Sequence, residues 1–195
     1  MYTQYGTRVT PSVGQVRDSA TGTSSATVSA TDADQQLAGL YYRIRALYGL
    51  ARVQWLCGFP DRALQSARQS MIEAAETGSP VNVSYSLVYS CYVFLWCGDL
   101  ETAQEMNETV MAQPHWQGRL MWFHAEALAL QGELLVRRGN VEAGIELLRD
   151  TVANMQSTSQ KNLMLSVTAC CLAEALATTG RAEEALTVIN EAIAL

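Results

Sequence analysis

The sequence has few charged residues and no motif for catalysis or phosphate binding. Charged side chains make up 16% of its 195 residues. The sequence has 13 lysines and arginines and 19 aspartates and glutamates, which gives a net charge of −6. Because non-specific nucleic-acid binding draws most of its affinity from basic side chains meeting phosphates, we expect no direct nucleic-acid binding. The patterns GxxxxGK[ST], GxGxxG and HExxH are all missing, so no P-loop, dinucleotide-binding or HExxH zinc chemistry is indicated.

Histidine and cysteine are also sparse, and neither is spaced for metal binding. The two histidines, His115 and His124, are nine residues apart and so do not share the helix face that paired ligands need. The five cysteines form an odd set without a C-x-x-C pair, which gives little support to disulfides or a zinc site. We expect reduced thiols in the core, with Cys57 and Cys97 packing alike before a glycine, and no metal or cofactor.

Long apolar runs are missing as well. No basic start followed by an apolar stretch occurs near the N-terminus, and no apolar segment is long enough to span a membrane. These absences predict a cytoplasmic protein with no membrane partner.

What the sequence does have is a repeat. Glycines at positions 58, 98, 139 and 180 are spaced by 40, 41 and 41 residues, and they open the segments GFPDRAL, GDLETAQ, GNVEAGI and GRAEEAL. Glycine is suited to ending a helix in a left-handed conformation, and acidic residues just after it favour the start of the next helix. A period near 40 is typical of stacked two-helix units. The sequence therefore predicts an all-α solenoid of about four antiparallel helix hairpins.

The hairpins are expected at about 37–78, 79–115, 116–159 and 160–195. Asp99 and Asn140 are predicted N-caps, and Pro60 is expected in the first turn of a helix. Small residues five positions after each glycine are expected where paired helices come closest; these are Ala63, Ala103, Gly144 and Ala185. Residues 1–34 are rich in Ser and Thr and lack periodicity, which predicts a flexible tail before a repeat domain at 35–195.

The segments GFPDRAL, EAGIELLRDTV and LAEALATTGRAEEALTVINEAIAL resemble tetratricopeptide-like (TPR) repeats at the C-terminal end of bacterial winged-helix/ATPase transcriptional regulators. The period of 40 to 41 is longer than the usual 34 of such repeats. The resemblance implies a right-handed α-solenoid and a non-enzymatic interaction or sensor module that binds a protein or peptide. It also implies that the first helix of each hairpin lines a concave groove. The residues expected there are Arg45, Tyr48, Arg52, Trp55, Tyr85, Tyr92, Trp96, Glu126, Glu133, Arg137 and Glu174.

This set is aromatic and basic in the first two repeats and more acidic in the other two. A peptide of acidic or aromatic character would suit the first half, because arginine and tyrosine offer charge-assisted hydrogen bonds together with apolar area. The same spacing is also typical of core aromatics, so Tyr92 and Trp96 could equally pack against a neighbouring helix. Arg45 and Arg52, seven residues apart on one face, are expected either in the groove or at a solvated edge.

Two other classes of function remain open at this stage. The terminal helix carries Leu186, Ile189 and Ile193, an apolar surface that predicts self-association through the ends of the array. Alternatively, a pocket that brings together His124, Glu126, Glu133 and Arg137 would favour an enzyme with acid–base chemistry.

Overall fold

The computed structural model describes residues 30–112, 121–157 and 163–194, and these consist of helices and short turns. Eight helices occur within these ranges. They are α1 (Ala30–Leu56), α2 (Pro60–Glu76), α3 (Pro80–Trp96), α4 (Leu100–Met111), α5 (Met121–Arg137), α6 (Val141–Ser157), α7 (Leu163–Thr178) and α8 (Ala182–Ile193). The predicted all-α solenoid is confirmed.

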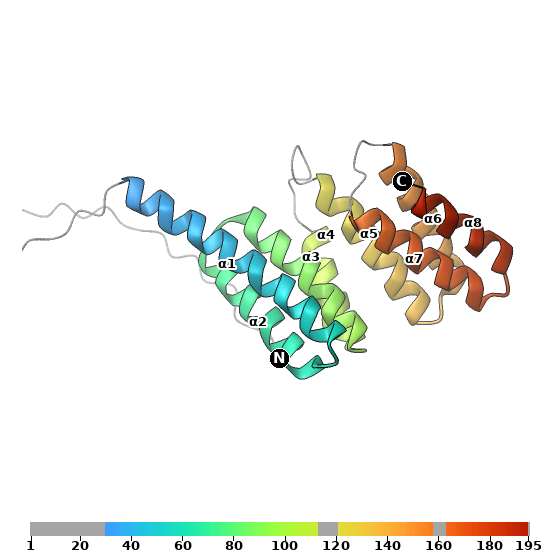
Figure 1. Cartoon of the computed structure of the whole chain (residues 1–195), viewed down its shortest axis with the longest axis horizontal. Coiled ribbons are helices and arrows are strands. Elements are labelled where there is room, and N and C mark those ends of the chain that lie inside the picture. The colour runs from blue at the N-terminus through green and yellow to red at the C-terminus, as the bar shows by residue number, and fades with distance from the viewer. Residues whose placement is uncertain (1–29, 113–120, 158–162, 195) are drawn as a thin grey trace, which may run out of the picture.

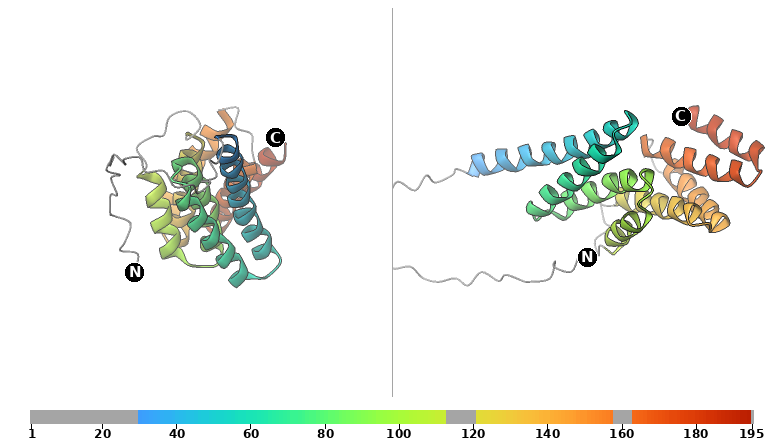
Figure 2. Two further views of the ribbon diagram at one scale, coloured as in Figure 1. Left: turned by 90° about the vertical axis from the view of Figure 1, so that its left-hand side faces the viewer. Right: turned by 90° about the horizontal axis from the view of Figure 1, so that it is seen from below.

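Consecutive helices pair as four hairpins that stack along one axis (Figure 1). The first helices form a continuous layer, because α1 contacts α3, α3 contacts α5, and α5 contacts α7. Each second helix packs on the first helix of its own hairpin, and α2, α4 and α6 also pack on the first helix of the next hairpin. Seen from below, α1 lies at one end of the array and α8 at the other (Figure 2). The inner layer of first helices is therefore the surface on which the groove residues were expected.

The repeat glycines end the first helices as the sequence predicts. Gly58, Gly98, Gly139 and Gly180 have φ angles of 81°, 82°, 90° and 80°, a left-handed conformation that side chains with a Cβ rarely adopt. In each case the next residue donates its N–H back across the turn, as Phe59 does to the Gln54 carbonyl at 2.9 Å. This Schellman-type hydrogen bond satisfies a carbonyl at the helix end and turns the chain toward the second helix.

Local signals also fix where the second helices begin. Pro60 stands in the first turn of α2, where its missing N–H costs no helical hydrogen bond. The Asp99 carboxylate accepts a hydrogen bond from the Thr102 N–H at 3.2 Å and so caps α4. Both predictions are confirmed.

Small residues let the helices of a hairpin approach closely. Ala63 and Ala103 are completely buried, and Ala185 is 8% exposed. Gly144 in α6 lies against the Gly132 carbonyl and Val136 of α5, so closely that an added Cβ would clash with both. The predicted contact points are therefore occupied as expected.

Other expectations differ from the structure. Helix α1 begins at Ala30, so residues 30–34 are helical and not part of a tail; the rest of the predicted tail, 1–29, lies outside the described residues, as does His115. Cys57 and Cys170 are exposed, which corrects the expectation of core thiols, although Cys91 is buried. None of the described helices is long and apolar enough to cross a membrane.

Candidate functional site: the inner face of the first helices

The expected groove residues lie on the four helices of the inner layer, but the structure buries some of them. Arg45, Arg137 and Glu174 are exposed, and Arg52, Trp55, Tyr85 and Trp96 are partly exposed. Tyr48, Tyr92, Glu126 and Glu133 are buried. Among the expected groove residues, the accessible aromatic side chains and two of the three arginines therefore lie on α1 and α3.

Arg45 is held among tyrosines. Its guanidinium hydrogen-bonds to the Tyr41 hydroxyl at 2.6 Å and lies 5.4 Å from the centre of the Tyr41 ring and 5.7 Å from that of Tyr85. The aromatic faces attract the cation, and the Tyr41 hydroxyl raises its pKa further. Arg45 therefore bridges α1 and α3 while its side chain stays exposed.

Arg52 lies two turns further along the same face. Its guanidinium is 5.8 Å from the centre of the Trp96 ring, and Trp55 and Trp96 contact each other with ring centres 4.8 Å apart. In the part of the chain that the structure describes, neither Arg45 nor Arg52 forms an ion pair with a carboxylate. Both guanidinium groups therefore retain hydrogen-bonding capacity for an external anion.

Tyr89 belongs to this surface, although it was not among the expected residues. It stacks on Tyr48 with ring centres 4.8 Å apart and on Tyr85 at 6.0 Å, and its hydroxyl donates to a Glu126 carboxylate oxygen at 3.3 Å. Burial raises the pKa of Tyr48 to about 12 and raises that of Tyr89 as well, so both hydroxyls stay protonated. Tyr89 follows Tyr85 by four residues, a helical spacing that could have identified it.

Tyr92 corrects an expectation. It is 2% exposed and packs among the core residues of α3 and its neighbours, and its hydroxyl has no hydrogen-bond partner within the described residues. Tyr48, 8% exposed, is likewise a core residue rather than an open groove position. The physical reason is that α3 is covered by α1, α2, α4 and α5, which leaves only a narrow strip of its surface accessible.

Glu126 is a buried carboxyl on α5. It is 3% exposed, one of its oxygens accepts the Tyr89 hydrogen bond, and the other has no partner among the described residues. Desolvation raises its pKa to about 7, opposed by the Tyr89 hydrogen bond and by the positive charge of Arg52. Glu126 is therefore a buried hydrogen-bond partner of Tyr89 and not an exposed groove carboxylate.

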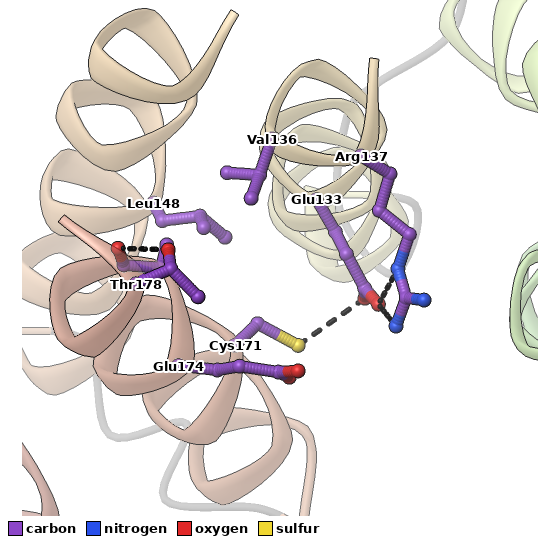
Figure 3. Close-up of a pocket in the computed structure, with 8 residues that line it drawn as sticks. Glu133, Val136, Arg137, Leu148, Cys171, Glu174 and Thr178 are labelled. Atoms are coloured by element: carbon purple, nitrogen blue, oxygen red, sulfur yellow. Dashed lines mark hydrogen bonds and ion pairs between the residues drawn. The ribbon is translucent and has the colours of Figure 1, made fainter. Parts of the chain in front are cut away.

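A cavity of about 130 Å³ lies further along the inner layer, between α5, α6 and α7 (Figure 3). The Glu133 carboxylate accepts from the Arg137 guanidinium at 3.0 and 3.2 Å and from the Cys171 thiol at 3.2 Å. Burial raises the pKa of Cys171, and the adjacent Glu133 carboxylate raises it further, so the thiol is a poor nucleophile. Glu133 and Arg137 therefore neutralise each other within this half of the layer.

The arrangement does not favour the acid–base alternative. The cavity contains Glu133 and Arg137 but is not lined by His124 or Glu126. No group of three or more potential metal ligands occurs in the described residues.

A second, larger cavity of about 480 Å³ lies on the other side of α3, between α2 and α4. It is mainly apolar, with Met71, Leu87, Phe94 and Met106 among its lining residues. Arg68 stands at this cavity with its guanidinium 5.3 Å from the centre of the Phe94 ring. The sequence analysis gave no indication of this cavity, because its residues are also ordinary inter-helix contacts.

Comparisons with known proteins agree with this architecture. Residues 44–69 and 166–191 match the family model of the tetratricopeptide repeat. Both segments begin 14 residues before a repeat glycine, Gly58 or Gly180, and end 11 residues after it, so the glycine register and the family model coincide. No curated protein sequence is significantly similar to the chain.

Among solved structures, the chain is similar to a crystal structure of nearly identical TPR-like repeats from a putative kinesin light chain of Podospora anserina. The two chains are 18% identical, the match covers 83% of this chain and 82% of that one, and the TM-score is 0.49. Two of the four hairpins therefore contain segments similar to the tetratricopeptide repeat, a type of repeat that generally mediates protein–protein interactions.

Proposed function

We propose that the chain binds an extended, acidic polypeptide segment on the inner face of its first two repeats. The single observation that carries this proposal is the pair Arg45 and Arg52. Both guanidinium groups are accessible and held over aromatic rings, and neither is neutralised by a carboxylate of the described chain. In a protein of net charge −6, two such cations on one helix face are a distinctive feature.

The chemistry of the surface favours a carboxylate-bearing partner with some apolar character. Each guanidinium can donate a pair of hydrogen bonds to a carboxylate, while the exposed parts of Trp55, Tyr85 and Trp96 offer contact area for aliphatic or aromatic side chains. The aromatic contacts fix the two arginines before the ligand arrives, which lowers the entropic cost of binding.

The module would act as a recognition or sensor unit within, or related to, a bacterial transcriptional regulator in the cytoplasm. This context rests on the resemblance of the repeat sequences to those of winged-helix/ATPase regulators. In such an arrangement the repeats recognise the partner, and DNA binding and nucleotide hydrolysis reside in other domains.

The test is an affinity measurement with unstructured peptides of matched length that differ in Glu and Tyr content. We expect the purified chain to retain acidic, tyrosine-containing peptides and to release their Gln-substituted counterparts. The double variant R45A/R52A should bind about 100-fold more weakly, since a hydrogen bond to a charged group contributes about 1.5 kcal/mol and two such anchors are lost.

The matched control is R62A/R68A, which removes the same charge from the outer helix α2. It should bind like the unmodified chain. If R62A/R68A weakens binding and R45A/R52A does not, the ligand occupies the cavity between α2 and α4 and the proposal is wrong. If neither variant changes the affinity for any acidic peptide, the two arginines are not recognition residues.

A further inference from the structure

One face of α1 is exposed, whereas the same face of the later first helices is mostly buried. Tyr42, Leu50 and Val53 are 68%, 46% and 55% exposed, and Ala46 between them is also exposed; we call these four residues the α1 stripe. Counted from the repeat glycine, Val53 corresponds to three residues that are at most 1% exposed: Val93, Leu134 and Ala175.

Most counterparts of the other stripe positions are buried as well, although Asn82 and Gln131, which correspond to Tyr42 and Leu50, are partly exposed. Ala46 corresponds to three residues that are at most 1% exposed: Ser86, Ala127 and Thr168. Two of the counterparts of Tyr42, Phe123 and Met164, are at most 3% exposed. These positions are buried in later repeats because each first helix packs on the preceding hairpin. Within the described residues, the α1 stripe is therefore an inter-repeat surface on which no hairpin packs.

Helix α8 presents the complementary half of the same contact. Leu186 and Ile193 are 63% and 78% exposed, and Ile189 is partly buried in the hairpin core. By position after the glycine, Leu186 corresponds to Leu64 and Ile193 to Met71. Leu64 and Met71 are packed against the core cluster that includes α3. Leu186 and Ile193, the α8 face, therefore lie where the first helix of a following repeat would pack.

The two surfaces fit each other in position and in charge. Helix α3 packs on the α1–α2 hairpin through the positions that correspond to the α1 stripe. The α1 stripe of one molecule could therefore pack in the same way on the α7–α8 hairpin of another. Helix α1 carries three arginines and two aspartates, a net positive charge, whereas α8 carries three glutamates and no basic residue. These opposite charges at the two ends of the array would steer one end toward the other.

We propose that a second copy of this chain is the occupant, bound head to tail, with the α1 stripe of one molecule on the α8 face of the next. A second copy is favoured over another partner because both complementary halves of the contact are present on this one chain. The contact is heterologous, so it leaves a free stripe and a free face at the two ends and allows further copies to add. The α1 stripe and the α8 face share no residue with the proposed peptide site on the inner face.

Sedimentation of the chain and of two end-blocked variants tests the proposal. Val53→Arg places a charge on the α1 stripe, and Ile193→Arg places one on the α8 face; both positions are exposed, so the fold should persist, as circular dichroism would verify. We expect the average mass of the unmodified chain to rise with concentration beyond that of a dimer. Each blocked variant alone should remain a monomer, and an equimolar mixture should form a dimer that grows no further.

Leu56→Arg and Thr187→Arg are matched controls on the same helices, because both residues are exposed but lie outside the stripe and the face. They should associate like the unmodified chain. A monomeric unmodified chain at all concentrations would overturn the proposal and assign these surfaces to another protein or to flanking repeats. Association of Val53→Arg by itself, or a mixture that stays monomeric, would also overturn it. Leu50→Arg with Leu186→Arg serves as a second pair if either first variant unfolds.

Discussion

Substitution of Gly144 by valine is expected to lower the free energy of unfolding by about 3 kcal/mol, the upper end of the usual cost of overpacking. A Cβ at this position would lie 2.5 Å from a Val136 methyl carbon and 2.8 Å from the Gly132 carbonyl oxygen. A methyl group can rotate away, but the carbonyl belongs to the backbone of α5. Relief of this clash therefore requires α5 and α6 to move apart.

The measurement is urea unfolding followed by circular dichroism, with Ala143→Val as the control. Ala143 is the exposed neighbour on the same helix. The control loses helix propensity without a clash, whereas Gly144→Val gains a little helix propensity, so a larger loss of stability in Gly144→Val reports the clash. The midpoint of Gly144→Val should fall well below that of the control. Equal midpoints for the two variants would contradict the close approach of α5 and α6.

The unmodified protein is expected to lose stability as pH rises toward 7, and the variant Glu126→Gln should not show this loss. The folded-state pKa of Glu126 is raised to about 7 from an ordinary value of 4.5, so the folded protein holds this proton more tightly than the unfolded chain. Stability therefore falls as pH rises from about 4.5 to about 7 and then levels off. A shift of this size corresponds to as much as about 3 kcal/mol.

Glutamine keeps the shape of the side chain and can still accept the Tyr89 hydrogen bond. Unfolding measurements at a series of pH values should show that Glu126→Gln lacks this decline and is the more stable protein above pH 7. Tyr89→Phe, which removes the hydrogen bond that lowers the pKa of Glu126, should move the decline to higher pH. A constant difference between Glu126→Gln and the unmodified chain at all pH values would contradict a titrating carboxyl at this position.

Backbone architecture followed from the sequence because its signals are local. A left-handed turn after a helix requires glycine, and Gly58 and its three counterparts recur in one register, so helix ends and pairing could be predicted. The start of α1 could not, because residues 30–34 have no apolar periodicity. These residues form the first turn of α1, and the apolar residues that predict this helix occur later in its sequence.

The candidate site was predictable only in part. Arg45 and Arg52 could be expected to be accessible because arginine is rarely fully buried. Aromatic residues can be either buried or exposed. Tyr92 and Trp96 are four residues apart on one face of α3, yet Tyr92 is enclosed by neighbouring helices and Trp96 is partly exposed. The burial of Glu126 depends on how closely α3 and α5 pack, which no local pattern specifies.

Photo-crosslinking from single positions tests most directly whether the inner face of the first repeats binds the polypeptide. One photoreactive residue replaces Leu56, an exposed residue one helical turn after Arg52 on α1. The other replaces Ile72, an exposed residue at the cavity between α2 and α4. With an acidic, tyrosine-containing peptide, we expect crosslinks from position 56 that disappear in the R45A/R52A background, and none from position 72. Crosslinks from position 72 alone would place the ligand on the outer side and contradict the account.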